Sequence, residues 1–167
     1  MKSFAVAASL ALAFLAFALV PSSATAFDLS AIGVRAGEMD PEGAGGAFTV
    51  GGHLEFEQSG TRLHLQPGVL FWSSGSLSDV NPNFDVMYHF QRAGTVSPYV
   101  GGGAGLHFYS LDLPGPNETN TDIGLNLLGG LLIPASTLRL FVEGRYVATD
   151  RSQAMIAGGA TFPLGHH

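Results

Sequence analysis

Histidines near acidic residues or a serine are the residues of this chain best suited to catalysis or metal binding. His107 and Ser110 are three residues apart, so in an extended strand they would project from opposite faces and could not act together as base and nucleophile. None of the interior histidines has a recognisable metal-ligand spacing. We therefore predict no catalytic residues and no cofactor, and we interpret these histidines as hydrogen-bonding groups: His53, His64, His89 and His107.

Acidic residues form the second group with chemical potential. Glu38, Asp40 and Glu42 are closely spaced in a segment that also contains Pro and Gly. Carboxylate oxygens are the ligands that Ca²⁺ and Mg²⁺ prefer, so weak cation binding here is one interpretation. The other is a solvated acidic rim, which also contains Asp79, Asp112 and Glu118. The solvated rim is the commoner state of such residues, and we predict no resident metal.

The composition restricts the class of protein. The 167 residues carry a formal net charge of -6, contain no cysteine and include only 12% charged residues, about half of the ~25% usual in globular domains. A disulfide scaffold and a cysteine-based zinc site are excluded because their ligands are absent. The chain is acidic and its single lysine is Lys2, so it lacks the basic surface that binds nucleic acid, and we predict no nucleic-acid partner. The length predicts one domain.

The N-terminal segment has the order of a secretion signal. Lys2 is followed by an apolar run from Phe4 to Val20 and then by the small residues Ser23 to Ala26. We predict cleavage before Phe27, which divides the chain into a signal peptide at 1–26, a domain at 27–162 and a tail at 163–167. An uncleaved membrane anchor is the alternative.

The rest of the chain alternates between apolar and polar residues. From Ala47 to Glu57, Phe48, Leu54 and Phe56 share one face with other apolar residues, while polar residues occupy the other. Strict period two predicts a strand with two unlike faces. Eight such strands are predicted: Leu29–Glu38, Ala47–Glu57, Arg62–Trp72, Asn83–Gln91, Pro98–Ser110, Thr121–Ile133, Leu138–Ala148 and Gln153–Phe162.

Connector lengths predict how these strands are arranged. Short links (Gln58–Thr61, Arg92–Ser97, Pro134–Thr137) alternate with longer ones rich in Gly, Pro, Asn and Ser (Met39–Gly46, Ser73–Pro82, Leu111–Asn120). This alternation predicts an all-β, eight-stranded antiparallel up-and-down barrel, with periplasmic turns and longer extracellular loops.

Strand length and aromatic placement favour a transmembrane barrel. The strands have about 9 to 13 residues, close to the ~9–11 needed to cross a bilayer and above the ~5–6 typical of soluble proteins. Two aromatic girdles are predicted on the apolar face, with Phe56, Phe90 and Phe162 at the periplasmic ends and Phe48, Phe71, Phe84, Phe108 and Tyr146 at the opposite ends. The alternative is a soluble periplasmic ligand-binding barrel with the apolar face inward.

Two glycine-rich stretches support a family resemblance. With the signal segment and the eight strands, Pro98–Leu106 and Gly158–Phe162 resemble small bacterial outer-membrane β-barrel proteins, such as the OmpA transmembrane domain, OmpX and Opa-like surface proteins. The resemblance implies outer-membrane localisation and a structural or surface-interaction role. It also implies contact with membrane lipid, lipopolysaccharide, an unidentified extracellular partner and the assembly machinery, which reads a C-terminal aromatic residue. Here Phe162 is followed by Pro163–His167, a departure from that pattern.

The polar face would line the barrel interior. On this register it carries three cations against four anions, and such charges are tolerated in a narrow lumen only when paired. Near balance predicts a lumen closed by a polar network, because a selective pore would show a surplus of one sign. A narrow channel or transport barrel for small or apolar solutes is the alternative. The predicted network comprises Arg35, Glu55, Asp85, Asp122, Arg139, Glu143 and Arg145.

Overall fold

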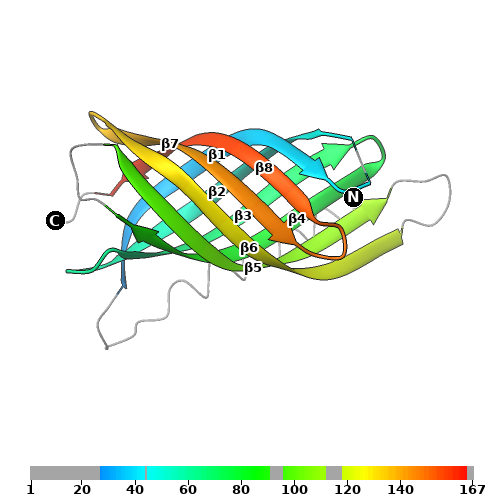
Figure 1. The fold of residues 1–167 in the computed structure, drawn as a ribbon, viewed down its shortest axis with the longest axis horizontal. Coiled ribbons are helices and arrows are strands. Elements are labelled where there is room, and N and C mark those ends of the chain that lie inside the picture. The colour runs from blue at the N-terminus through cyan, green and yellow to red at the C-terminus, as the bar shows by residue number, and fades with distance from the viewer. Residues whose placement is uncertain (1–26, 44, 91–95, 112–117, 165–167) are drawn as a thin grey trace.

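The computed structural model describes residues 27–43, 45–90, 96–111 and 118–164. They form one closed barrel in which each strand pairs antiparallel with its neighbours in sequence, and the last strand pairs with the first (Figure 1). The predicted eight-stranded antiparallel barrel is therefore confirmed. No helix among these residues is long and apolar enough to span a membrane. The predicted signal segment lies outside the described residues.

All strands except that at 138–148 are longer than predicted, and most of the gain is at the barrel end opposite Phe27 and Pro163. Their bounds are β1 (Phe27–Pro41), β2 (Ala47–Gln58), β3 (Leu63–Ser74), β4 (Leu77–His89), β5 (Ser97–Leu111), β6 (Glu118–Ala135), β7 (Leu138–Ala148) and β8 (Gln153–Pro163).

The predicted alternation of connector lengths is wrong. β3 and β4 are joined by Gly75 and Ser76 alone, and Ser73 pairs with Ser78 inside the segment that the sequence predicts as a long loop. Gly75 has a φ of 60°, which suits the first central position of a two-residue type II′ turn. Connector length therefore does not orient the barrel. We call the barrel end that contains Gly75 the Gly75 end. The opposite end, where β1 begins at Phe27 and β8 ends at Pro163, is called the terminal end.

β4 continues through Asn81 and Pro82, although these residue types are typical of loops. Pro82 has no N–H to donate, and the β4–β5 pairing has a gap between Val80 and Asn83. The side chain of Asn81 bridges this gap by donating to the carbonyl oxygen of Leu106 at 3.1 Å. A side-chain hydrogen bond thus compensates for the missing backbone bond.

The two faces of the wall have opposite polarity. In β7, Phe141, Glu143, Arg145 and Val147 are buried in the lumen, while the residues between them are exposed. The outer surface is apolar, with Ile156, Ile123 and Leu127 each about 70% exposed. An apolar exterior around a charged interior is the arrangement of a transmembrane barrel and the reverse of a soluble one.

Most of the predicted girdle residues lie close to strand ends and face outward. Phe48, Phe71, Phe90, Tyr146 and Phe162 are 43% or more exposed, and Phe56 and Phe108 are half-buried. Phe84 differs from the prediction. It lies at mid-strand because β4 begins at Leu77 rather than at Asn83. Its ring therefore faces outward at the middle of the wall.

Leu127 provides a test of the outer face. It is 69% exposed near the middle of β6, so Leu127→Arg should lower the free energy of unfolding by ~2–4 kcal/mol, the cost of a cation at the bilayer midplane. Ser76→Arg, in the exposed β3–β4 turn, is the control and should have almost no effect. Reversible unfolding in lipid vesicles measures both, and equal losses would contradict this assignment of faces.

Candidate functional site

Glu143 is the centre of a hydrogen-bonded charge network across the lumen. Its Oε1 accepts from Arg35 Nη1 at 2.6 Å and from Arg145 Nη2 and Nε at 3.2 and 3.3 Å. The Tyr99 hydroxyl donates to Oε2 at 3.0 Å. The Glu143 residue is only 1% exposed, so these donors from β1, β5 and β7 replace the hydration that the carboxylate loses on burial.

Arg35 extends the network toward β2 and β3. Its Nη2 donates to Gln66 Oε1 at 2.5 Å and lies 3.1 Å from His53 Nδ1. The guanidinium carbon also lies 5.5 Å from the centre of the Phe141 ring, within the range of a cation–π interaction. Because the guanidinium can only donate, the Nδ1 of His53 acts as the acceptor.

Arg145 extends the network in the other direction. Its Nη2 forms an ion pair with Asp85 Oδ2 at 2.8 Å, and Asn126 Nδ2 donates to Asp85 Oδ1 at 2.9 Å. Arg35, Glu143, Arg145 and Asp85 thus alternate in charge across the barrel. Four of the seven predicted network residues meet in this central layer.

Glu55 and Arg139, two further predicted network residues, lie nearer the terminal end. Arg139 Nη2 donates to Glu55 Oε2 at 3.1 Å. The other carboxylate oxygen lies 2.8 Å from His64 Nδ1, and the His64 ring stacks on that of His89 at a centroid distance of 4.0 Å. Glu55, His64 and His89 therefore form a compact group, which contacts the Glu143 layer through the His89 ring, stacked on that of Tyr99 at a centroid distance of 5.3 Å.

Asp122 is not brought into either layer. It is half-buried and pairs in register with His107, and no ion pair joins it to the network within the described residues. The partner of His107 is Asp79, whose Oδ2 lies 2.6 Å from His107 Nδ1. The sequence places Asp79 in a solvated loop, which is wrong: β4 begins before it, and the residue is 1% exposed.

An apolar cluster at the Gly75 end was not predicted. Trp72, Met39 and Met155 are 2% exposed or less, and the cluster also contains Leu70 and Tyr109. Tyr109 holds its position because Gln153 Nε2 donates to its hydroxyl at 2.7 Å. Large apolar residues at inward positions of the alternation, Trp72 above all, were the available signal. This cluster fills the lumen between the charged layers and the Gly75 end.

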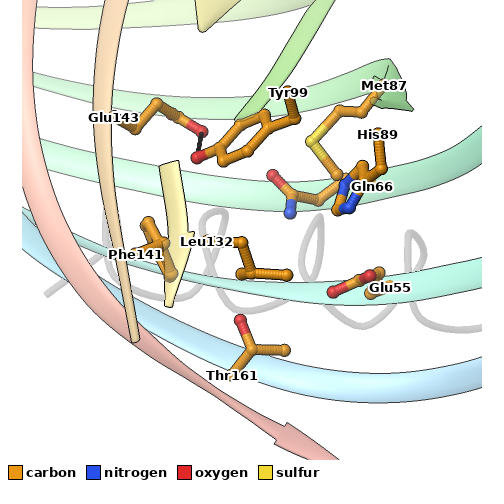
Figure 2. A pocket seen from close by; sticks show the side chains of 9 residues that line it. All are labelled: Glu55, Gln66, Met87, His89, Tyr99, Leu132, Phe141, Glu143 and Thr161. Atoms are coloured by element: carbon orange, nitrogen blue, oxygen red, sulfur yellow. Dashed lines mark hydrogen bonds between the residues drawn. The ribbon is translucent and has the colours of Figure 1, made fainter. Parts of the chain in front are cut away.

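A small cavity is lined by Glu143 and Tyr99 of the central layer and by Glu55 and His89 (Figure 2). Its volume is about 10 Å³, about enough for one water molecule. Glu143 and its bonded Tyr99 lie on one side of the view, and Glu55 and His89 on the other. Side chains thus fill most of the space between these residues, as expected for eight strands.

Glu38, Asp40 and Glu42 are not among the ligand-type side chains that the fold brings together in the described part of the chain. All three are exposed, and the ligand-type side chains that converge among the described residues are Glu55, His64 and His89 instead. The fold therefore does not bring the three carboxylates together, and weak cation binding by them stays a hypothesis. They alternate outward with buried residues along the end of β1 and just beyond it, which spreads their carboxylates along the rim.

Comparisons with known proteins agree on architecture. No protein-family model and no curated protein sequence matches the chain. Similar solved structures include neisserial surface protein A (TM-score 0.67, 16% identity, 81% of this chain and 96% of that chain). They also include the N-terminal β-barrel domain of Pseudomonas aeruginosa OprF (0.63, 14%, 83% and 100%) and the attachment invasion locus protein Ail of Yersinia pestis (0.61, 14%, 83% and 100%).

This chain has the fold of the small outer-membrane β-barrels. The resemblance that the alternating strands predict is confirmed at this level. Identities of 14–16% speak for the fold alone, so the role of the lumen has to be argued from its own side chains.

Glu143 tests the charged layer. Glu143→Ala should lower the free energy of unfolding by about 3–5 kcal/mol, because Arg35 and Arg145 would keep buried charges without their shared partner. Glu143→Gln should cost less, since the amide oxygen still accepts a hydrogen bond. Glu57→Gln, at an exposed position, is the control and should be nearly neutral. Urea unfolding in vesicles would contradict the layer's role if Glu143→Ala matched Glu57→Gln.

Proposed function

We propose that this chain is a non-catalytic outer-membrane β-barrel of a bacterial cell envelope, with a structural or surface-interaction role and a closed lumen. The apolar outer wall supports a lipid environment, and the secretion-type segment at 1–26 supports export. The fold of the similar structures agrees with this location. A soluble periplasmic ligand-binding barrel would need the apolar face inward, and here the apolar face is outward.

The proposal of a closed lumen rests on two successive barriers along the barrel axis. The Glu143 layer crosses the barrel with its charges mutually paired, and the cluster around Trp72 packs the lumen toward the Gly75 end. An ion would have to displace paired charges and then lose its hydration against apolar side chains. The narrow-channel alternative requires a continuous path, whereas the cavity between the layers holds about 10 Å³.

The most catalytic-looking pair, Asp79 and His107, supports a structural role. His107 Nε2 is buried with no hydrogen-bond partner among the described residues. A Cβ added at Gly124 would lie 2.7 Å from this nitrogen, so the wall of β6 blocks it. Ser110, the nucleophile that the sequence pairs with His107, alternates to the outer face. A histidine base needs a nucleophile within reach and a cavity for the substrate to catalyse hydrolysis, and His107 has neither among the described residues.

The partners follow from the outer surface. Membrane lipid and lipopolysaccharide would contact the apolar wall, and the assembly machinery would read β8, where Phe162 faces outward and is 47% exposed. A rim partner would meet Asp40, Glu42 and Asp150, all exposed. A structure of Ail contains the heparin analogue sucrose octasulfate, but an acidic rim disfavours a sulfated ligand for this chain.

Conductance tests the closed lumen. The purified barrel should give no steady current in planar bilayers. A Trp72→Ala, Glu143→Ala double variant, which weakens both barriers, should open at least intermittently and serves as the positive control. Regular single-channel current steps from the wild type would contradict the closed lumen and favour the narrow-channel alternative.

Cysteine labelling tests location and orientation, because the native chain has no cysteine. Both Glu42 and Ser59 are exposed in connectors at opposite ends of the barrel. Glu42→Cys should react with an impermeant thiol reagent on intact cells, and Ser59→Cys only after lysis. The reverse pattern would invert the orientation, and no labelling of either on intact cells would contradict a surface-exposed barrel. The predicted extracellular loop at Leu111–Asn120 lies largely outside the described residues.

A further inference from the structure

Glu55, His64 and His89 bring three potential metal ligands to one point in the lumen. They come from the consecutive strands β2, β3 and β4, and one ligand atom from each lies within 4.8 Å of the others. All three residues are more than nine-tenths buried, with exposures of 2%, 6% and 7%. The group is therefore enclosed by the barrel and not part of its exposed rim.

Unsatisfied polar atoms mark this group as incomplete. Glu55 Oε1 and His64 Nδ1 are 2.8 Å apart, yet neither has a hydrogen bond of good geometry, and His89 Nε2 is also buried without one. A buried polar atom without a partner is costly, and native proteins supply one, often an ion or water. His89 Nε2 lacks a partner among the described residues, while Glu55 Oε1 and His64 Nδ1 have only each other, so one ion would engage all three residues.

We propose that Glu55, His64 and His89 bind one divalent transition-metal ion, for which zinc is the best match. Two imidazole nitrogens and one carboxylate oxygen are a recurrent zinc ligand set, usually completed by a water molecule. The cavity of about 10 Å³ lined by Glu55 and His89 is close to one water in size and could hold that fourth ligand (Figure 2). The nitrogen lone pairs lie in the ring planes, so the stacked His64 and His89 rings would have to rotate apart to direct one nitrogen each at the ion.

The surroundings of the three ligands fit an ion held at the terminal end. Arg139 binds Glu55 through Oε2 and leaves Oε1 facing His64, so it orients the carboxylate while opposing the ion's charge. Asp28 and Glu57 pair in register toward the same end and are exposed, which adds negative charge near the entrance. Arg62 also lies at this end, with its guanidinium bonded to the Phe90 carbonyl oxygen. Three carboxylates thus stand against two guanidinium groups.

The bound ion would act as a clamp. It would link β2, β3 and β4 on the terminal-end side of the Glu143 layer and give His89 Nε2 the partner that it lacks among the described residues. A ligand that binds only the folded barrel stabilises it in proportion to its affinity and concentration. This inference does not depend on the proposed function, because a lumen metal is compatible with a silent or a conducting barrel.

Zinc titration of the refolded chain tests the proposal. The parent should carry His166→Ala and His167→Ala, because the paired histidines of the tail could bind zinc on their own. Isothermal titration calorimetry in detergent or nanodiscs should find one Zn²⁺ per chain. Co²⁺ in its place should give the intense visible absorption of a four-coordinate site. A parent without saturable zinc binding overturns the proposal.

Single-ligand variants distinguish this site from other histidines. His89→Gln and Glu55→Gln should each weaken zinc binding by more than about 100-fold, beyond the 10–100-fold typical of changes around a metal site. His107→Gln, at the Gly75 end, is the matched control and should leave the affinity unchanged. Zinc should raise the unfolding temperature of the parent and of His107→Gln but not of His89→Gln. Equal affinity in His89→Gln and the parent, with both folded, overturns the assignment. If His89→Gln does not fold, Glu55→Gln and the Co²⁺ spectrum of the parent decide.

Discussion

The outer surface of this barrel is apolar, so its charged side chains have to be buried inside. The pairing of these buried charges is the constraint on which the rest of the structure depends. The outward positions hold residues such as Ile123, Leu127 and Ile156, so the charged residues of the wall are confined to a narrow interior. A buried ion needs a partner of opposite sign and donors for its remaining lone pairs. Glu143 meets this requirement through Arg35, Arg145 and Tyr99, and the alternation of charge continues to Asp85.

The wall has to make room for this network. A Cβ at Gly130 would lie 2.5 Å from the Tyr99 hydroxyl, so glycine there lets Tyr99 reach over β6 to Glu143. Gly33 leaves similar space for the His53 ring. Glycines in the strands thus act as recesses for large inward side chains, which is a packing role rather than a turn role. The interior is correspondingly full, and the apolar cluster around Trp72 completes it at the Gly75 end.

The sequence predicts the strands and their faces well and their ends poorly. Alternation with period two is a local property of a chain that is polar on one side and apolar on the other, so the alternation alone assigns Leu54, Val86 and Val142 to the outer face. Strand ends obey a different rule. Beyond the apolar band, Pro41, Ser73 and Asn81 remain paired in strands, although their types are typical of loops. For the same reason the residue types wrongly predict Asp79 in solvent and Phe84 in a girdle.

The sequence by itself determined that charged residues face inward, that they nearly balance and that the outside is apolar. Only the tertiary structure decided which charges meet. Arg35 and Glu143 are 108 residues apart, and their contact depends on closure between β1 and β8, on strand tilt and on the width of the lumen. The grouping of Glu55 with His64 and His89 has the same origin, because register across three strands sets it and no spacing along the chain records it. Local periodicity assigns a side chain to a face, whereas its neighbours across the lumen depend on how the whole sheet closes.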